Sequence, residues 1–422
     1  MTPEPQPARA ANVAAIVDFY ESGMKQRAAM LGIELEHIVT KADGAPVSYS
    51  EPYGVRWLLE QLQGAYPDAT CDVDDDLIGV AREGQAVTIE PAAQLELSAG
   101  PFESLAVASA VFTAFDEEVR RILEPHGMEL HAIGYHPTMR AADLELIPKH
   151  RYDYMNRYLG AIGNFGIAMM RGSAAAQISI DYVSVKDCLR KMRVANALSP
   201  LFALMCDTAT TFEGAPRAHQ MVRTEIWEFC DPDRCGTVPG VMEGSFTLER
   251  YAEYILDTPA IVMLDDQGRA TYEERTFGEV FADTPMTRSN VEHALSMFFN
   301  DVRLKTYIEI RPADSMPVPY VLAYAALVKG LFYAAGALDK AAELTAGVTA
   351  EGIAEAKASL MAHGYEGELY GQPAAELADA VAAIAHEGLE AIAPDELRFL
   401  APLEELVAAR ETLATRAEAR AR

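Results

Sequence analysis

The chain has 422 residues, and its 63 acidic and 35 basic side chains give it a formal net charge of −28 at pH 7. Half of the residues are hydrophobic, which is typical of a globular protein with a large core and excludes a mainly disordered chain. The negative charge argues against nucleic acid or an anionic membrane surface as the main partner, although a phosphate-bearing ligand responds to local arginines and metal ions instead.

The cysteines and the N-terminal residues indicate a reducing compartment. The cysteine count is odd, and the CxxC spacing typical of a metal site does not occur. Residues 2–11 are rich in proline and alanine and lack the apolar core of a signal peptide. We therefore predict a cytoplasmic protein with free thiols. The five cysteines are Cys71, Cys188, Cys206, Cys230 and Cys235.

The first elements of the chain alternate between helix and strand. A helix is predicted over residues 11–31, and it runs into an acidic strand at Gly32. Ser50 supplies a capping oxygen and Pro52 suits the first turn of a second helix. Turn residues on both sides of 77–80 then predict a hairpin that leads to a second acidic strand.

Longer helices separate the remaining strands. The elements predicted after residue 100 are a helix over 102–124 that ends before Pro125 and Gly127, a strand over 129–135, a helix over 151–170, a strand over 176–182 and a helix over 185–206. Residues 207–244 are irregular and rich in proline, glycine, arginine and aspartate, and binding loops are often placed in such segments.

The chain becomes almost purely helical after Arg311. The apolar run over residues 319–338 contains Lys329 and two glycines and is followed by more helical sequence, so it predicts a buried core helix and not a membrane span. The mixture of strands and helices, without strict βαβ alternation, favours an α+β fold with an antiparallel sheet and packed helices. We predict a mixed domain over residues 1–338 and an all-helical segment over 339–422 that packs on the same domain.

Acidic side chains occupy alternate positions of three predicted strands. Successive strand residues point to opposite faces, so Glu34 and Glu36 share one face while Ile33 and Leu35 share the other. A face of carboxylates is costly to bury unless cations neutralise it. The pattern therefore predicts a sheet whose polar face collects divalent metal ions. The corresponding positions of the other two strands are Gln94, Glu96 and Ser98, and Glu309 and Arg311.

Oxygen ligands on several strands indicate a magnesium site. Mg²⁺ is usually bound by a few carboxylates together with substrate phosphates, an arrangement that suits phosphoryl transfer. The alternative interpretation, that each glutamate is an ordinary exposed strand residue, stays open on the pattern alone. The predicted ligands are Glu34, Glu36, Glu90, Glu96 and Glu309, with Gln177 as a neighbouring amide oxygen.

Arginines form a second candidate set. A guanidinium group matches the geometry of carboxylates and phosphates, so arginines at strand or loop positions can clamp an anionic amino acid or a nucleotide. Surface salt bridging is the alternative, and it is weaker for Arg311, which shares a strand face with Glu309. The sequence has no Walker loop, GxSxG or HExxH motif, and no Cys–His arrangement that indicates a nucleophile. The arginines are Arg171, Arg223, Arg234 and Arg311.

Several short segments occur in an order that resembles one protein family. As an ordered set over residues 32–338 they resemble the plant and proteobacterial branch of the glutamate–cysteine ligase family. They are Gly32-Ile-Glu-Leu-Glu36, Ile89-Glu-Pro-Ala-Ala-Gln-Leu-Glu-Leu-Ser98, Pro148-Lys-His-Arg-Tyr152, the strand with Gln177, Arg223-Thr-Glu-Ile-Trp227 with Asp231-Pro-Asp-Arg234, and Val302-Arg-Leu-Lys-Thr-Tyr-Ile-Glu-Ile-Arg311.

The resemblance implies an ATP-dependent ligase whose catalytic sheet, within residues 1–338, is of the glutamine-synthetase type. In that family ATP phosphorylates the γ-carboxylate of glutamate, and the amine of cysteine attacks the acyl phosphate. The five glutamates and Gln177 would bind two or three Mg²⁺ ions, with Mn²⁺ as the alternative ion. The other roles that the resemblance implies are phosphate stabilisation by Arg311 beside Glu309, nucleotide binding by Lys149 and Arg311, and substrate binding by Arg171, Arg223, Arg234 and Trp227.

Two departures from the family pattern leave the amine acceptor open. Ala92 and Ala93 stand where the family often has two glycines, which excludes backbone angles that only glycine adopts, and residues 312–317 differ from the plant pattern. The alternative functions are a γ-glutamyl ligase with another amine, a phosphotransferase of the guanidino kinase type, and a sensor without catalysis. The expected partners are the small molecules glutamate, cysteine and ATP, with no nucleic acid and no membrane, and the oligomeric state is open.

Overall fold

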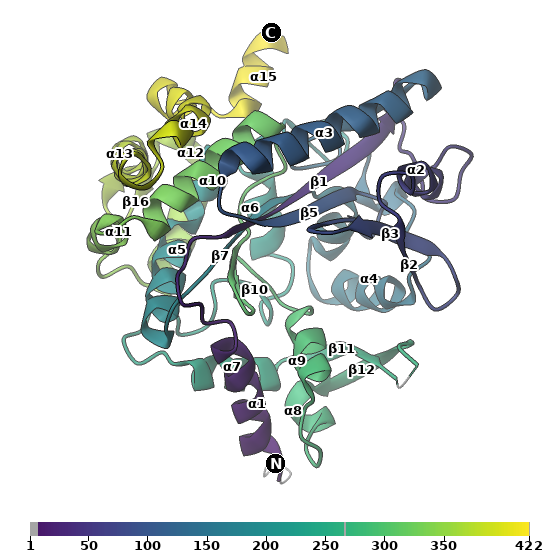
Figure 1. Ribbon diagram of the computed structural model, residues 1–422, viewed down its shortest axis with the longest axis horizontal. Helices are drawn as coiled ribbons and strands as arrows, with labels where there is room; N and C mark the ends of the chain where they lie inside the picture. Colours follow the sequence, from purple (N-terminus) through teal and green to yellow (C-terminus); the bar gives the residue numbers. More distant parts are fainter. Residues whose placement is uncertain (1–6, 266, 422) are drawn as a thin grey trace.

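A nine-stranded antiparallel sheet forms the centre of the computed structural model, which describes residues 7–265 and 267–421 (Figure 1). The strands follow the order β14-β15-β7-β1-β5-β4-β3-β2, and β6 pairs with the end of β1. This arrangement confirms the predicted α+β class with an antiparallel sheet. The strand bounds are β1 Leu31–Lys41, β2 Asp68–Cys71, β3 Leu77–Arg82, β4 Gln85–Ile89, β5 Leu95–Phe102, β6 Met128–His131, β7 Ala176–Ile180, β14 Val302–Leu304 and β15 Ile308–Ile310.

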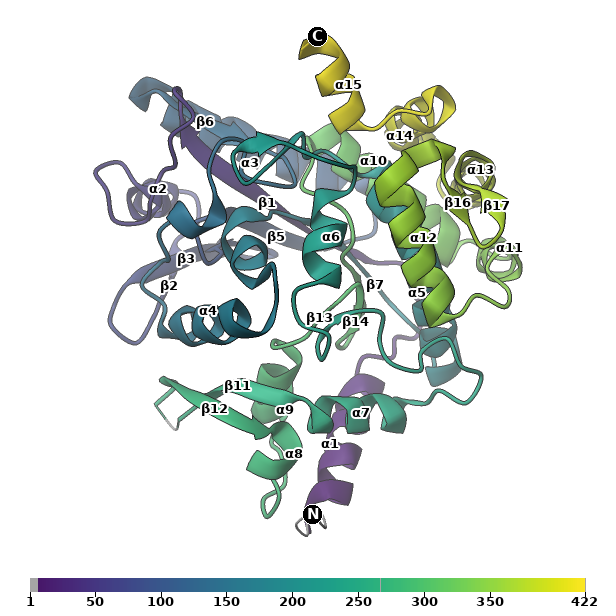
Figure 2. The same cartoon turned by 180° about the vertical axis from the view of Figure 1, so that it is seen from behind.

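The alternation of apolar and polar residues in β1 gives the sheet two different faces. Leu31, Ile33 and Leu35 are at most 1% exposed, and they face the layer that contains α3 (Leu105–Leu123) and α10 (Val318–Tyr333) (Figure 1). Glu34 and Glu36 point to the opposite face, over which α4 (His150–Ile162) and α6 (Val222–Glu228) lie (Figure 2). The predicted parity of β1 is therefore confirmed.

The remaining helices and short strand pairs surround this sheet. The helices are α1 Arg9–Glu21, α2 Val55–Leu62, α5 Val185–Met205, α7 Leu248–Asp257, α8 Phe277–Val280, α9 Arg288–Leu295, α11 Ala337–Leu344, α12 Ala350–His363, α13 Ala374–Ile392, α14 Leu397–Ala409 and α15 Leu413–Ala421. The short strand pairs are β8 Thr211–Phe212 with β9 Ala215–Pro216, β10 Cys235–Gly236 with β13 Phe299–Asn300, β11 Pro259–Leu264 with β12 Ala270–Thr276, and β16 Glu368–Leu369 with β17 Gln372–Pro373. Single helical turns lie at Glu124–His126, Ala141–Asp143, Ala168–Gly172, Gly364–Glu366 and Pro394–Glu396.

Two predicted helices are shorter in the structure, and each ends near a glycine that approaches another backbone. The helix predicted over residues 11–31 is α1, which ends at Glu21, because Gly23 lies so close to the carbonyl of Thr306 that a Cβ would clash. The helix predicted over 151–170 is α4, which ends at Ile162. Gly163 then packs against the carbonyl of Cys230 with no room for a Cβ. Both close approaches turn the chain out of the helix.

Two further boundaries differ from the prediction for reasons of pairing and capping. The strand predicted over 129–135 ends at His131. It pairs with residues 38–41 of β1, whereas residues 31–35 of β1 pair with β7 on the same side. The second helix, α2, begins at Val55 after the capping residue Gly54, so Ser50 and Pro52 lie in the preceding turn.

The helices that follow Arg311 form a layer beside the sheet. Within it, α13 and α14 pack on α10, and α12 packs on α5 (Figure 2). A buried ion pair of 2.6 Å joins Lys329 of α10 to Glu396. Among the described residues no single helix has the length and hydropathy of a membrane span; α10 and α11 reach them only together, with a bend of 95° between them, and α10 is mostly buried.

Candidate active site

A cavity of about 420 Å³ lies on the polar face of the sheet. Strands β1 and β5 contribute its floor, while α4, α6 and the β14–β15 hairpin contribute its walls. Most of the residues that the sequence predicted for the site meet here, although they come from segments far apart in the chain. Those that line the cavity are Glu34, Glu36, Glu90, Glu96, Lys149, Gln177, Arg223, Trp227 and Arg311.

Strand register places the acids of β1 and β5 side by side. Glu36 lies directly opposite Glu96 in the β1–β5 pair, and like charges in that position repel each other. The backbone N–H of Ala175 donates to Glu36 at 2.7 Å, while the hydroxyls of Thr88 and Ser98 donate to Glu96 at 3.1 and 2.9 Å. These neutral donors orient the carboxylates but leave their charge uncompensated.

Burial and mutual repulsion raise the pKa values of these acids. The pKa of Glu34 rises to about 8, first because it is removed from solvent and second because Glu96 and Glu309 lie near it. Burial and the neighbouring Glu90 raise the pKa of Glu96 to about 7. Burial, followed by Glu90 and Glu96, raises the pKa of Glu36 well above its usual value. A cation in the cavity would favour the ionised form of all these groups.

The donor set of the cavity fits a hard divalent cation. Within residues 7–265 and 267–421, no hydrogen bond or ion pair ends on the carboxylates of Glu34 and Glu90, so these oxygens are available to a ligand. The same part of the chain holds no preformed cage of three or more His, Cys, Asp or Glu side chains. Mg²⁺ does not require one, because it is usually bound by one or two carboxylates together with substrate phosphates.

Glu309 differs from the other acids because three cations neutralise it. Arg303, Lys305 and Arg311 pair with its carboxylate at 2.6, 3.1 and 2.9 Å. Although burial opposes ionisation, these cations hold the pKa of Glu309 below its usual range. Arg311 also donates to the amide oxygen of Gln177. Glu309 is fully buried and lies behind the cavity surface instead of lining it. It holds the three cations in place beside the cavity.

Three cationic residues that received no role in the sequence analysis also line the cavity. They are Arg151, Arg303 and Lys305. Arg303 lies opposite Glu309 in the β14–β15 pair, which explains its salt bridge. The period-two argument that selected Glu309 and Arg311 would also have selected Arg303 and Lys305, because both alternate with apolar residues on the preceding strand.

Helix α6 presents two predicted substrate residues one turn apart. Arg223 is 3% exposed, donates to the carbonyl of Ala313 at 2.8 Å and lies 3.7 Å from the carboxylate of Asp314. Trp227 packs against Phe299 with 5.8 Å between the ring centres. The Nε of Arg223 and the indole N–H of Trp227 are buried and have no acceptor among the described residues. Two unpaired donors at a cavity wall match a ligand carboxylate.

The turn that carries Glu90 is fixed by the side chain of Gln94. The amide oxygen of Gln94 accepts from the N–H of Ala92 at 2.8 Å, and its NH₂ donates to the carbonyl of Ser173 at 3.0 Å. Ala93 adopts the left-handed region with φ of 66°, which alanine reaches at a cost of about 1–2 kcal/mol. This turn therefore holds Glu90 at the cavity with alanines at positions 92 and 93.

The structure does not bring Arg171 and Arg234 into the lining of the cavity. Arg171 donates to the amide oxygen of Asn156 and to the carbonyl of Leu144 at 2.8 Å. Arg234 is completely buried, pairs with Asp231 at 2.6 Å and donates to two backbone carbonyls. Because their donors are already used, both arginines hold loops together around the site. Sequence position alone did not distinguish them from Arg223, which lines the cavity.

The raised carboxyl pKa values predict a pH-dependent effect of Mg²⁺ on stability. The unfolded chain ionises its glutamates near their ordinary pKa of about 4.3, whereas Glu34 holds its proton up to about pH 8 in the folded state. The contribution of Glu34 to the stability of the metal-free protein should therefore fall between these values as the pH rises. We expect Mg²⁺ to raise the melting temperature more at about pH 8 than at about pH 6.

The measurement is a thermal melt in EDTA and in excess Mg²⁺ at both pH values, with a sodium salt of equal ionic strength as the control. An equal shift at both pH values, or an equal shift with the sodium salt, would contradict a cation site among these acids.

Comparisons with known proteins support one family. The family model described as "Glutamate-cysteine ligase family 2(GCS2)" matches residues 30–418. The chain is 30% identical over 341 residues to the chloroplastic glutamate–cysteine ligase of Brassica juncea, covering 79% of this chain and 66% of that protein. It is 27% identical over 379 residues to glutamate–cysteine ligase B of Oryza sativa subsp. japonica, covering 88% and 76%. The matched region thus spans just under two thirds of the Brassica protein.

Solved structures support the fold. The chain superposes on glutamate–cysteine ligase from Francisella tularensis in complex with AMP with a TM-score of 0.56 at 11% identity, covering 93% of this chain and 84% of that one. It superposes on the bifunctional glutathione synthetase from Pasteurella multocida with a TM-score of 0.52 at 14% identity, covering 96% and 51%. At such low identity these matches speak for the fold alone.

Proposed function

This chain belongs to glutamate–cysteine ligase family 2, and from that membership we propose that it forms γ-glutamylcysteine from glutamate, cysteine and ATP. The observation that carries the proposal is the cavity in which unpaired carboxylates face a cluster of arginines and lysines. Amide formation from a carboxylate requires activation, and phosphorylation by ATP provides it when several negative charges are held together. No protein nucleophile is needed for this chemistry.

The acids on the sheet are the proposed metal side of the site. Mg²⁺, when bound with ATP, would neutralise the charge that develops on the transferring phosphate. Glu34, Glu36, Glu90 and Glu96 would supply carboxylate oxygens, with the amide oxygen of Gln177 at the same face. Glu309 contributes by holding Arg303, Lys305 and Arg311 in place. We propose two or three such ions, as the family resemblance implies.

The cationic residues are the proposed anion-binding side. Arg311 is preorganised by Glu309 and Gln177, so it can stabilise the phosphate without reorganising during the reaction. Lys149 lines the cavity beside Glu90 and would bind ATP phosphates. Arg223 and Trp227 would hold the α-carboxylate of glutamate through their unpaired donors.

We extend the proposal to the fold type, the domain roles and the location. We assign catalysis to a sheet of the glutamine-synthetase type within residues 1–338, and the helices of 339–422 pack on α10 and α5 of the same domain. The proposed ligands are small molecules. All five cysteines are free in the structure, which supports a reducing compartment, and we propose the cytoplasm. The names of the plant relatives place those proteins in the chloroplast.

Substrate-dependent release of ADP tests the proposed function. With glutamate, cysteine and Mg-ATP the purified protein should release ADP and phosphate, and omission of any one substrate should stop the release. Hydroxylamine in place of cysteine should give a glutamyl hydroxamate, because hydroxylamine attacks an acyl phosphate but not the free carboxylate of glutamate. If ADP release does not respond to cysteine but does respond to another amine, that amine and not cysteine is the acceptor. ADP release without any hydroxamate would contradict the acyl phosphate.

A further inference from the structure

The helix α6 carries two residues of the proposed site but has only seven residues of its own. Arg223 and Trp227 both line the cavity from this helix. Such a short helix does not hold its position by itself, since helical stability in proteins comes mainly from tertiary packing. Its neighbours are β10, the helical turn Ala168–Gly172 and α12, and the last of these belongs to the C-terminal helical segment that contributes no motif to the family resemblance (Figure 2).

A buried lysine of α12 ties the end of α6 to the catalytic sheet. The ammonium of Lys357 pairs with Glu228, the last residue of α6, and with Asp301 at 2.6 Å. The lysine side chain is only 4% exposed. Asp301 is itself fixed, because its N–H donates to the carbonyl of Gly236 and its carbonyl accepts from the N–H of Arg311, both at 2.9 Å. Lys357 therefore connects α6 to the backbone of the residue that we propose to contact phosphate.

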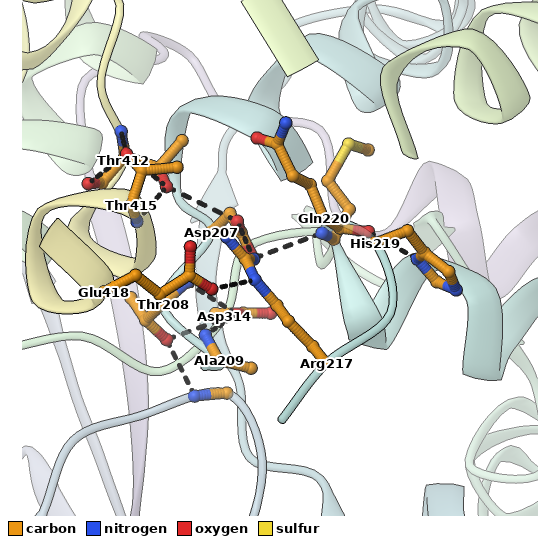
Figure 3. A network of polar contacts seen from close by, with 12 residues as sticks. Asp207, Thr208, Ala209, Arg217, His219, Gln220, Asp314, Thr412, Thr415 and Glu418 are labelled. Carbon is orange, nitrogen blue, oxygen red and sulfur yellow. Dashed lines mark hydrogen bonds and ion pairs between the residues drawn. The ribbon is translucent and has the colours of Figure 1, made fainter. Parts of the chain in front are cut away.

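The start of α6 is tied to the same C-terminal segment. The N–H of Gln220 donates to the carbonyl of Met361 in α12 at 3.0 Å. The next N–H, that of Met221, donates to the buried carboxylate of Asp207 at 3.2 Å. Figure 3 shows this carboxylate within a network that reaches the last helix of the chain. Arg217 pairs there with both Asp207 and Glu418 of α15.

The charge of Lys357 is well matched to its surroundings. Burial alone would favour the neutral amine, but Asp301 and Glu228 raise the pKa of the lysine above its usual value. Loss of the cation would leave two carboxylates facing each other between α6 and the sheet. A small cavity of about 160 Å³, lined by Trp227 and Lys357 among others, lies beside them. The helix therefore has space into which it can shift when the tie is broken.

We propose that Lys357 is a positioning residue, whose ammonium fixes α6 and thereby sets the affinity for the amino acid substrate. The identity of that substrate rests on the proposed function, whereas the tie between Lys357 and α6 does not depend on it. The first variants are Lys357→Met, which removes the cation, and Glu228→Gln, which releases α6 while Lys357 keeps Asp301 as its partner. Lys340→Met is the matched control, because Lys340 forms an exposed ion pair with Glu387 in the same C-terminal segment.

Steady-state kinetics give the first readout. Lys357→Met and Glu228→Gln should each raise KM for glutamate by about tenfold, because small displacements of binding groups have effects of this size. KM for ATP should change by less than about twofold, since the backbone hydrogen bond between Asp301 and Arg311 does not depend on Lys357. Lys357→Arg, which keeps the charge, should recover part of the loss. The control should match the wild type in both constants. A lower melting temperature with unchanged KM for glutamate would overturn the inference.

Tryptophan fluorescence gives a second readout that needs no activity. The chain has two tryptophans, Trp57 in α2 and Trp227 in α6, so in a Trp57→Phe background the emission reports on Trp227 alone. Glu228→Gln and Lys357→Met should shift this emission and increase its quenching by acrylamide, whereas Lys340→Met should not. Unchanged emission in both Glu228→Gln and Lys357→Met would overturn the inference. A wild-type protein without ADP release would refute the proposed function, and the fluorescence result would still decide the role of Lys357.

Discussion

Replacement of Arg311 by methionine should lower the rate of acyl phosphate formation by about 10²–10³-fold, the usual effect of removing a preorganised donor from a transition-state site. Its guanidinium is fixed by Glu309 at 2.9 Å and by the amide oxygen of Gln177, and it lines the cavity. The fold should survive, because Arg303 and Lys305 still neutralise Glu309.

The measurement is the rate of hydroxamate formation from glutamate, Mg-ATP and hydroxylamine, which isolates the activation step from the amine. Arg140→Met serves as the matched control, since Arg140 forms an exposed ion pair with Asp143. Hydroxamate formation at the wild-type rate in the Arg311 variant would contradict the role of this arginine. If the variant loses only the cysteine-dependent rate and keeps hydroxamate formation, Arg311 acts in amine binding and not in phosphate transfer.

The variant Glu36→Gln should lose activity by at least about 10²-fold while the metal-free protein becomes more stable. Glu36 faces Glu96 across the β1–β5 pair, and burial with Glu90 and Glu96 as neighbours raises its pKa well above the usual value. At neutral pH the unfolded chain carries this carboxylate ionised at no cost, whereas the folded state opposes its charge. An amide of the same shape removes that cost and keeps an oxygen that can accept from the N–H of Ala175.

In EDTA the melting temperature of the Glu36→Gln variant should exceed that of the wild type by about 1 °C, the shift that roughly 1 kcal/mol produces in a chain of 422 residues. In Mg²⁺ the order should reverse, because the wild type gains more from the cation. Glu129→Gln is the control, since Glu129 is an exposed acid on β6 of the same sheet. A variant that is less stable than the wild type in EDTA would contradict the repulsion among these acids.

Much of the site followed from the two-residue period of the strands. The parity of Glu34 and Glu36 predicted a polar face, and the structure places both in one cavity with residues of β5 and β7. The same parity did not reveal that Glu309 is already neutralised. That fact depends on the β14–β15 hairpin, whose register places Arg303 opposite Glu309. The period-two pattern selects these cations, but it does not show that they pair with Glu309 instead of facing a ligand.

Loops and helix ends were harder to predict. Arg171, Arg223 and Arg234 look alike in the sequence, but only Arg223 has an unpaired donor at the cavity, because the other two satisfy local carbonyls and side chains. The break in the helix predicted over 151–170 depends on the approach of Gly163 to Cys230, a contact between distant segments. The sequence also contains no indication of Lys357, because its partners Glu228 and Asp301 are remote in sequence.

The order of strands in the sheet has a consequence for folding. Strand β7 joins β1, from the first tenth of the chain, to β15, which is formed by residues 308–310. During synthesis the acids of β1 and β5 are made long before Arg311 can approach them. Pairings between such distant segments form slowly, because a long loop must close before any contact is gained. The cavity is thus assembled late, and recovery of its activity after denaturation reports on completion of the whole sheet.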